Sequence, residues 1–215
     1  MSSINPFFTM NYDQPLEYQF SHDSVFLART VFDLVQSQKL PSAHVLDLCA
    51  GCGIIGLDFL FHLSNGNLPL PESIDFVEVQ NIYFSYFKKN KNRLNLKIEL
   101  QFLNLNYKDL LLQKNLKNKY DLIICNPPYF RKEQGKLSPS DFKNRCRFYL
   151  DADFQSLLVS IQYTLSETGM AYVLVRSLES HGINVEAEMR SFQKDLHIKK
   201  IDKIRATDLY EIKKN

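Results

Sequence analysis

Short apolar runs, rich in β-branched residues, alternate with helix-forming stretches along the chain after residue 44. The apolar runs have the length of buried strands, and we expect strands at 45–49, 74–79, 98–103, 120–125 and 170–175. The stretches between them predict helices at 54–63, 81–94, 154–165 and 185–196. Because strands that alternate with helices form a parallel sheet covered on both faces, the pattern predicts a doubly wound α/β fold.

The two ends of the chain add further elements. Apolar residues between Val25 and Val35 form one broad face, which predicts a helix capped by Ser21 or Asp23. We interpret the tail at 197–215 as a final pair of strands, which makes the sheet mostly parallel and seven-stranded. The segments 64–73 and 131–151 predict loops. We therefore expect a single domain over 1–215, with an N-terminal helical extension at 1–43 and a core at 44–215.

The composition excludes several classes of protein. Hydrophobic residues make up 45% of the 215 residues, which is enough for one buried core. Four cysteines do not make a disulfide framework, and no second pair or histidine cluster completes a metal site around Cys49 and Cys52. The segment 1–10 lacks the pattern of a signal peptide, and no apolar run approaches the roughly 20 residues of a membrane span. We expect a monomeric protein of the reducing cytoplasm, without a metal or membrane partner.

A glycine-rich turn follows the first predicted strand. The sequence runs from Asp47 through Gly51, Gly53 and Gly56 into a predicted helix. Glycines are required where the backbone approaches a ligand closely, because a Cβ atom would collide with it. Glu78 lies 22 residues after Gly56, where a carboxylate can accept hydrogen bonds from two ribose hydroxyls. The three glycines also satisfy the pattern of a nicotinamide dinucleotide site, so the spacing alone does not select the cofactor.

The tetrapeptide Asn126-Pro127-Pro128-Tyr129 follows the fourth predicted strand. Two prolines end the hydrogen-bond ladder and fix their φ angles, so the Asn126 side-chain oxygen and the Pro127 carbonyl become oriented acceptors. Such acceptors orient a planar amino group, whose lone pair is delocalised, and favour its pyramidal, more nucleophilic form. Tyr129 offers a flat face for stacking. The motif predicts chemistry at an amino nitrogen on a π system, without a strong general base.

These motifs resemble those of class I S-adenosylmethionine (SAM) methyltransferases, which have a Rossmann-like fold and an acid at the position of Asp47. Within that class the chain resembles the amino-methyltransferases with an Asn-Pro-Pro-Tyr motif, and most of all the bacterial tRNA adenine-N6 methyltransferases acting on valine tRNA. The segment 18–28 is also similar to the part of that family that precedes the first strand.

The resemblance implies a cofactor and a set of roles. The cofactor is SAM, and the residues implied to hold or flank it are Phe20, His22, Asp23, Asp47, Gly51, Gly53, Glu78, Asn104 and Asn126. The implied catalytic residues are Asn126, Pro127, Pro128 and Tyr129. The family usually has an Asp where this chain has Asn104, whose amide oxygen can accept the same hydrogen bond without a charge.

Basic residues gather at 88–97, at 131–147 and at 194–205. We interpret the first and third groups as solvated surface. The second group follows the catalytic motif, and phosphate contacts hold RNA through basic side chains. We therefore expect Tyr129, Arg131, Arg145 and Arg147 to bind the substrate, and we expect that substrate to be RNA, in particular tRNA.

Two other functions stay open. A glutamine side chain also presents a planar amino group, so protein glutamine methylation of the release-factor type is an alternative. Against it, only about 44 residues precede the first predicted strand, whereas such enzymes carry a larger N-terminal domain. The other alternative is a non-catalytic, SAM-binding partner protein, although such a protein has no need for the Asn126 motif. DNA methylation is disfavoured because no recognition domain accompanies the core.

Overall fold

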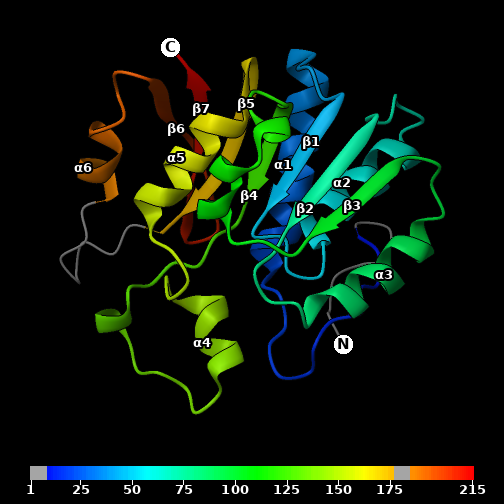
Figure 1. Cartoon of the computed structure of the whole chain (residues 1–215). Helices are drawn as coiled ribbons and strands as arrows, with labels where there is room; N and C mark the ends of the chain where they lie inside the picture. Colours follow the sequence, from blue (N-terminus) through cyan, green and yellow to red (C-terminus); the bar gives the residue numbers. More distant parts are fainter. Residues whose placement is uncertain (1–8, 177–184) are drawn as a thin grey trace.

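A computed structural model describes residues 9–176 and 185–215, which form a central sheet with helices on both faces (Figure 1). The strands are β1 (His44–Leu48), β2 (Ser73–Val77), β3 (Glu99–Leu103), β4 (Tyr120–Cys125), β5 (Leu165–Val175), β6 (Leu196–Ile204) and β7 (Thr207–Lys214). The α-helices are α1 (His22–Gln38), α2 (Ile54–Asn65), α3 (Tyr83–Leu94), α4 (Asp141–Arg147), α5 (Phe154–Thr164) and α6 (Val185–Arg190). Short 3₁₀ helices lie at Tyr107–Leu112, Lys114–Leu116 and Lys132–Gln134.

The seven strands lie in the order β3-β2-β1-β4-β5-β7-β6. The first five are parallel, and β7 runs antiparallel to both of its neighbours. This arrangement confirms the predicted doubly wound, mostly parallel sheet and the final strand pair. Because β1 lies between β2 and β4, the chain leaves the carboxyl ends of β1 and β4 in opposite directions, which opens a crevice at that edge of the sheet.

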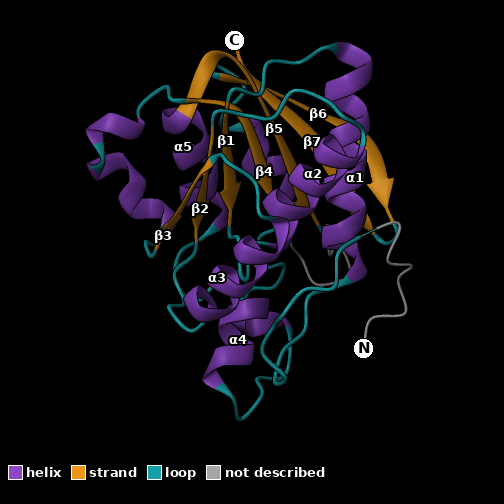
Figure 2. Cartoon of the chain, turned by 90° about the vertical axis from the view of Figure 1, so that its right-hand side faces the viewer, coloured by secondary structure: helices purple, strands orange, loops and turns teal. Residues whose placement is uncertain are grey.

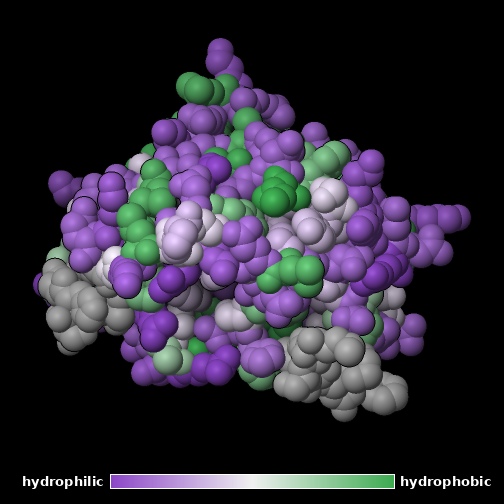
Figure 3. Space-filling view, turned by 90° about the horizontal axis from the view of Figure 1, so that it is seen from below, coloured by the Kyte–Doolittle hydropathy of each residue, from purple (hydrophilic) through white to green (hydrophobic). Residues whose placement is uncertain are grey.

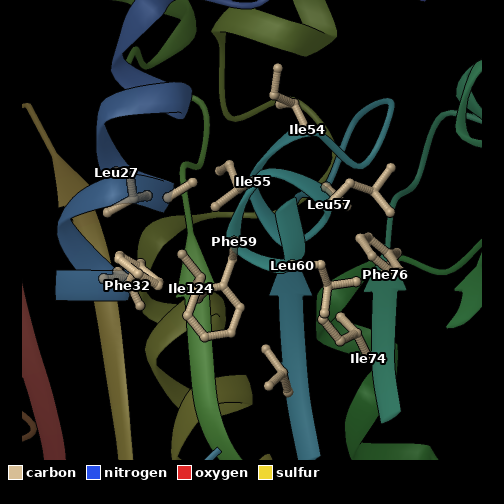
Figure 4. Packing of buried hydrophobic residues seen from close by; sticks show 14 of the residues in the cluster. Leu27, Phe32, Ile54, Ile55, Leu57, Phe59, Leu60, Ile74, Phe76 and Ile124 are labelled. Atoms are coloured by element: carbon tan, nitrogen blue, oxygen red, sulfur yellow. The ribbon is translucent and has the colours of Figure 1, made fainter. Parts of the chain in front are cut away.

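The two faces of the sheet are covered by different helices. Successive strand residues point to opposite faces, so Val45 packs in the core shared with α1, α2 and α3, whereas Leu46 packs in the core shared with α5 and α6. Figure 2 shows the sheet edge-on between α5 on one side and α1 and α2 on the other. In Figure 4, Leu27 and Phe32 of α1 lie on one side of Ile124 of β4 and Phe59 of α2 lies on the other, within one apolar layer. The broad apolar face predicted for the first helix is therefore the face that packs on the sheet.

Several helix and strand boundaries differ from those predicted from the sequence. The segment 131–151, predicted as a loop, contains α4, because the Ser140 hydroxyl accepts a hydrogen bond from the Lys143 amide and caps a short helix. The helix predicted at 185–196 ends at Arg190, because Leu196 is fully buried as the first residue of β6. The first two strands end earlier than predicted, at Leu48 and Val77. Ser21 occupies the N-cap position of α1 without a side-chain capping bond, and the other candidate cap, Asp23, lies in the first turn.

Over the described residues, none of the helices combines the length and the apolar character that crossing a bilayer requires.

The layer between the sheet and α2 makes a measurable contribution to stability. Leu60 is fully buried in this layer, whereas the side chain of Leu16 is 93% exposed. We predict that Leu60→Ala lowers the free energy of unfolding by about 2–5 kcal/mol, because it removes buried methyl groups and leaves a cavity. The matched control Leu16→Ala should change it by no more than about 0.5 kcal/mol. Urea denaturation of both variants measures the difference, and equal stabilities would contradict the packing described above.

Candidate active site

A cavity of about 420 Å³ lies at the carboxyl ends of β1, β2 and β4. Its walls come from the segment before α1, the glycine turn, the residues after β2, the tetrapeptide after β4 and the region of α4. The predicted site residues that line it are Phe20, Asp23, Gly51, Glu78, Asn126, Pro127, Pro128, Tyr129, Arg145 and Arg147. The side of the molecule seen from below in Figure 3 is mainly hydrophilic, with hydrophobic residues in small groups.

Five predicted site residues do not line this cavity: His22, Asp47, Gly53, Asn104 and Arg131. Their contacts give them other places in the structure. Gly53 stands at the N-terminal end of α2 with a φ of 81°, and a Cβ atom there would lie 2.7 Å from the ring of Phe87. Gly53 is therefore required by the turn itself and by the packing of α3 against it.

Asp47 holds the glycine turn from its buried side, through a hydrogen bond to the backbone. Its carboxyl group is fully buried, Oδ2 accepts a hydrogen bond of 2.8 Å from the Gly56 amide, and Oδ1 has no hydrogen-bond partner within the described residues. Burial raises the pKa of Asp47 to about 7, and the nearby charge of Glu78 acts in the same direction. The contact between Asp47 and Gly56 fixes the start of α2 relative to the end of β1.

Glu78 joins the glycine turn to the end of β2. Its Oε2 accepts from the Gly51 amide at 2.9 Å, and its Oε1 accepts from the Gln80 amide at 2.8 Å. Burial raises the pKa of Glu78 to about 7, against the two amide hydrogen bonds and the positive charge of Arg145, which lower it. Each carboxylate oxygen can accept a second hydrogen bond. Glu78 thus lines the cavity with acceptor capacity suited to a pair of hydroxyls.

Asn104 holds backbone rather than facing the cavity. Its amide nitrogen donates to the carbonyl oxygens of Glu78, at 2.8 Å, and Val79, at 3.1 Å. Asn106, two residues later, lines the cavity, and its side chain donates to the Asp151 carbonyl at 2.9 Å. Asn104 is the first asparagine after β3, and the spacing of the sequence carries no signal that favours Asn106.

The tetrapeptide after β4 presents the Asn126 side chain in a defined orientation. Its nitrogen donates to the Ser24 hydroxyl at 2.9 Å, and its oxygen accepts a hydrogen bond from the Tyr129 hydroxyl. Ser24 is buried in the first turns of α1. Burial raises the pKa of Tyr129, and the charge of Asp23 raises it further, so the Tyr129 hydroxyl remains protonated. Ser24 therefore turns the Asn126 oxygen away from α1.

The hairpin between β6 and β7 reaches the same place. The Thr207 hydroxyl donates to Asp23 Oδ2 at 3.4 Å, and the Arg205 guanidinium lies 3.5 Å from Asp23 Oδ1. Asp23 lines the cavity next to Ser24 in the sequence. The C-terminal strand pair, for which the sequence suggested no role, thus supports the wall of the cavity that carries Asn126.

α4 forms another wall of the cavity, and side-chain contacts of Arg145 and Cys146 hold it in place. The Arg145 guanidinium makes a two-pronged ion pair with Asp151, at 3.0 Å and 2.8 Å. Gln80 donates to the Cys146 sulfur at 3.3 Å, and the Tyr83 hydroxyl lies at the same distance from it. Arg145 is therefore committed to an ion pair inside the protein, and Arg131 forms an ion pair with Glu188. Among the predicted substrate-binding arginines, Arg147 is the one that lines the cavity without an ion-pair partner in the described part of the chain.

The segment before α1 forms one wall of the cavity. Asn90 is buried, and its side chain exchanges hydrogen bonds with the backbone of Asp13 at 2.7 Å and 2.9 Å. The same amide donates to the Cys52 carbonyl in the glycine turn at 3.2 Å. Gln14 and Tyr18, which follow Asp13, line the cavity. Tyr18 belongs to the segment 18–28 that the family resemblance singles out, whereas Gln14 carries no sequence signal, and the place of both residues depends on this long-range contact.

Cys49, Cys52 and Cys125 lie near the glycine turn because β1 and β4 are adjacent, whereas Cys146 belongs to α4. Cys49 and Cys52 line the cavity, and Cys125 is buried beside Cys49. Burial raises the pKa of the Cys52 thiol to about 12 and that of Cys125 above its usual range. Over residues 9–176 and 185–215, no group of three or more Cys, His, Asp or Glu side chains could hold a metal ion.

A family model described as Conserved hypothetical protein 95 matches residues 26–139, and the chain belongs to this family. The chain is 31% identical over 101 residues to a release factor glutamine methyltransferase of Borreliella burgdorferi, covering 47% of this chain and 31% of that protein. It is 27% identical over 170 residues to a tRNA1(Val) (adenine(37)-N6)-methyltransferase of Aliivibrio fischeri, covering 77% of this chain and 64% of that one. The chain thus spans between about a third and two thirds of the length of these relatives.

Solved structures share the fold at low identity. Ribosomal protein L11 methylase from Lactobacillus delbrueckii subsp. bulgaricus is 13% identical with a TM-score of 0.60, covering 91% of this chain and 80% of that one. TrmN from Thermus thermophilus is 14% identical with a TM-score of 0.58, covering 89% of this chain and 49% of that one. The sheet order and these likenesses show the class I methyltransferase fold, with its Rossmann-like core.

The raised pKa of Asp47 gives stability a defined pH dependence. Because the folded state holds a proton up to about pH 7, whereas the unfolded state releases it near its ordinary pKa, this group stabilises the fold most at low pH. We predict that wild-type stability falls relative to Asp47→Asn as the pH rises from 5 to 8. The slope should approach about 1.4 kcal/mol for each pH unit below pH 7.

Chemical denaturation at several pH values measures this slope. The exposed Asp33→Asn variant serves as the control, and its stability should keep the wild-type dependence on pH. A constant difference between wild type and Asp47→Asn over the same range would contradict a buried, raised carboxyl group.

Proposed function

We propose that this chain is a SAM-dependent methyltransferase that modifies the N6 amino group of adenine in RNA, with tRNA as the substrate. The observation that carries the proposal is the oriented Asn126 oxygen. It lies at the wall of a cavity whose neighbouring wall is the Gly51 turn tied to Glu78. Acceptor and cofactor cradle lie side by side because β1 and β4 are adjacent.

The residues present fit SAM on two counts. Gly51, with a φ of 55°, brings bare backbone to the cavity wall, and Glu78 keeps acceptor positions for ribose hydroxyls beside it. When bound, SAM supplies a methyl group on a positively charged sulfur. The protein's part is to hold the ribose at Glu78, to enclose the cavity with Tyr18 and α4, and to exclude water.

The substrate amino group is oriented by the tetrapeptide. One hydrogen of the adenine amino group donates to the Asn126 oxygen, replacing the hydrogen bond that the Tyr129 hydroxyl makes there. The other donates to the Pro127 carbonyl, and the released Tyr129 ring stacks on the base. These contacts favour the pyramidal nitrogen, and the proton becomes acidic only after the methyl group has transferred. A strong base at this position is therefore unnecessary.

Two comparisons support RNA as the substrate. The matches to tRNA adenine-N6 methyltransferases of three Aliivibrio strains extend over 77–80% of this chain, and those to glutamine methyltransferases over 40–56%. A further relative, at 27% identity over 152 residues, is a ribosomal RNA large subunit methyltransferase of Buchnera aphidicola. We further expect the chain to act as a monomer in the cytoplasm.

We predict that Asn126→Ala lowers methyl transfer at least about 100-fold while SAM affinity stays within about twofold, because the substitution removes an acceptor needed mainly in the transition state. The assay measures transfer from radiolabelled SAM to total tRNA and ribosomal RNA, followed by nucleoside digestion. Calorimetry measures SAM binding. Asn92→Ala, on the exposed side of α3, is the matched control and should transfer at the wild-type rate.

The identity of the product decides among the remaining functions. N6-methyladenosine supports the proposal, and another methylated amino nucleoside would keep the chemistry but overturn the adenine assignment. Because relatives named release factor glutamine methyltransferase match the chain as well, a release-factor protein is assayed in parallel. Transfer to its glutamine without transfer to RNA would overturn the RNA substrate. Equal transfer by Asn126→Ala would overturn the role of the tetrapeptide.

We predict that SAM affinity increases as the pH rises from 6 to 8, because Glu78, with a pKa of about 7, accepts hydroxyl hydrogen bonds best when ionised. Glu78→Gln should bind SAM about tenfold more weakly at pH 8 and lose most of this pH dependence. Calorimetric titrations of both proteins at several pH values measure the effect. A pH profile shared by the two proteins would argue against contact between Glu78 and the ribose.

A further inference from the structure

The wall beyond the tetrapeptide is built around Phe130. The Tyr129 and Phe130 amides both donate to the Arg147 carbonyl, at 3.1 Å and 3.0 Å, and Phe130 forms an isolated β-bridge with Phe148. The Tyr149 amide closes the bridge by donating to the Phe130 carbonyl at 2.8 Å. The end of α4 is therefore fixed to the backbone that carries the catalytic asparagine four residues earlier.

Two guanidinium groups lie against the Phe130 ring. The Arg147 guanidinium lies 5.7 Å from the centre of this ring and 5.4 Å from that of Phe148. The Arg176 guanidinium, at the end of β5, lies 5.8 Å from the Phe130 ring. Both arginines are half-buried and line the cavity. A cation over an aromatic face is attracted to the ring, and a guanidinium group in that position keeps N–H groups that can donate to an anion.

These two cations differ from the other arginines of the region. Arg131 and Arg145 are neutralised by Glu188 and Asp151. Over residues 9–176 and 185–215, no carboxylate lies within ion-pair distance of Arg147 or Arg176. Both guanidinium groups are thus positive charges at the cavity wall that no described carboxylate neutralises, so an anion that enters the cavity beside Phe130 is attracted by both.

We propose that Arg147 and Arg176, whose guanidinium groups lie over the Phe130 ring, form a phosphate clamp that holds the backbone phosphodiester next to the methylated nucleotide. This inference rests on the proposed function and adds the part of the RNA that the site holds, which is the backbone phosphodiester beside the target nucleotide. A base that enters the cavity leaves its stack, and holding the adjacent phosphate offsets part of that cost. Guanidinium groups match the paired oxygens of a phosphate, whereas the neutral amide of a glutamine side chain offers them no anion.

The test compares Arg147→Gln, Arg176→Gln and the double variant with wild type in the full chain. Arg29→Gln is the control, because the Arg29 guanidinium also lies over a ring, that of Phe32, but is ion-paired with Asp33 and lies outside the cavity. The probe is a fluorescein-labelled RNA hairpin with adenines in its loop, and its binding is followed by fluorescence anisotropy over a range of salt concentrations. Calorimetry of SAM binding reports whether each variant keeps the cofactor site.

We predict that each clamp substitution weakens RNA binding about tenfold and lowers the slope of log affinity against log salt by about 1. SAM affinity should stay at the wild-type value in all variants, and Arg29→Gln should bind RNA as wild type does. A hairpin that carries a neutral methylphosphonate beside the target adenosine should bind wild type more weakly than the unmodified hairpin does. The double variant should bind the two hairpins with equal affinity.

The failure of the clamp and the failure of the proposed function are distinguishable. If wild type methylates no RNA, the proposed function fails. The clamp is still supported in that case if the clamp variants lose hairpin binding and the Arg29→Gln control keeps it. Unchanged hairpin binding in the double variant, or an equal loss with Arg29→Gln, would overturn the clamp. The clamp would also be overturned if neither wild type nor the double variant bound the hairpin and both methylated a glutamine-containing peptide at the same rate.

Discussion

The hydrogen bond between the Gly51 amide and the Glu78 carboxylate connects the two strand ends on which the candidate site depends. It joins the turn after β1 to the residue after β2, and it places an acceptor beside bare backbone. Asp47 performs the complementary task on the buried side by fixing Gly56 at the start of α2. Because burial raises the pKa of both carboxyl groups to about 7, the turn is held at some electrostatic cost. Such a cost is expected where acceptors must be oriented before a ligand binds.

The tetrapeptide depends on parts of the chain that are remote in sequence. Asn126 is oriented by Ser24, which lies 102 residues earlier in α1. The neighbouring Asp23 accepts a hydrogen bond from the Thr207 hydroxyl of the C-terminal hairpin, 184 residues away. The first helix and the last strand pair therefore meet at the point where β4 ends. Both extensions of the parallel core contribute to the orientation of one side-chain oxygen.

Local patterns predicted the fold well, because strand and helix periodicity and the glycine turn are encoded within short segments. The adjacency of Gly51, Glu78 and Asn126 followed from the order of strands in a doubly wound sheet. The helix α4, in the segment before α5, was not predicted, because it is short and a single capping residue, Ser140, is a weak sequence signal for a helix. The ion pair that Arg145 makes with Asp151 could not be predicted from the sequence. Whether an arginine faces solvent or a carboxylate depends on where Asp151 lies after folding.

The hydrogen bond from Tyr129 to Asn126 has a consequence for selectivity. A site whose acceptor is already satisfied by the protein's own hydroxyl excludes ligands that cannot replace that hydrogen bond. An amino group replaces it and provides a second hydrogen for the neighbouring carbonyl, whereas a keto group at the same position of a base would place two acceptors in contact. Under the proposed function, the Asn126 oxygen and the Pro127 carbonyl thus favour amino over keto substituents, and the Tyr129 hydroxyl satisfies the Asn126 oxygen when no substrate occupies the site.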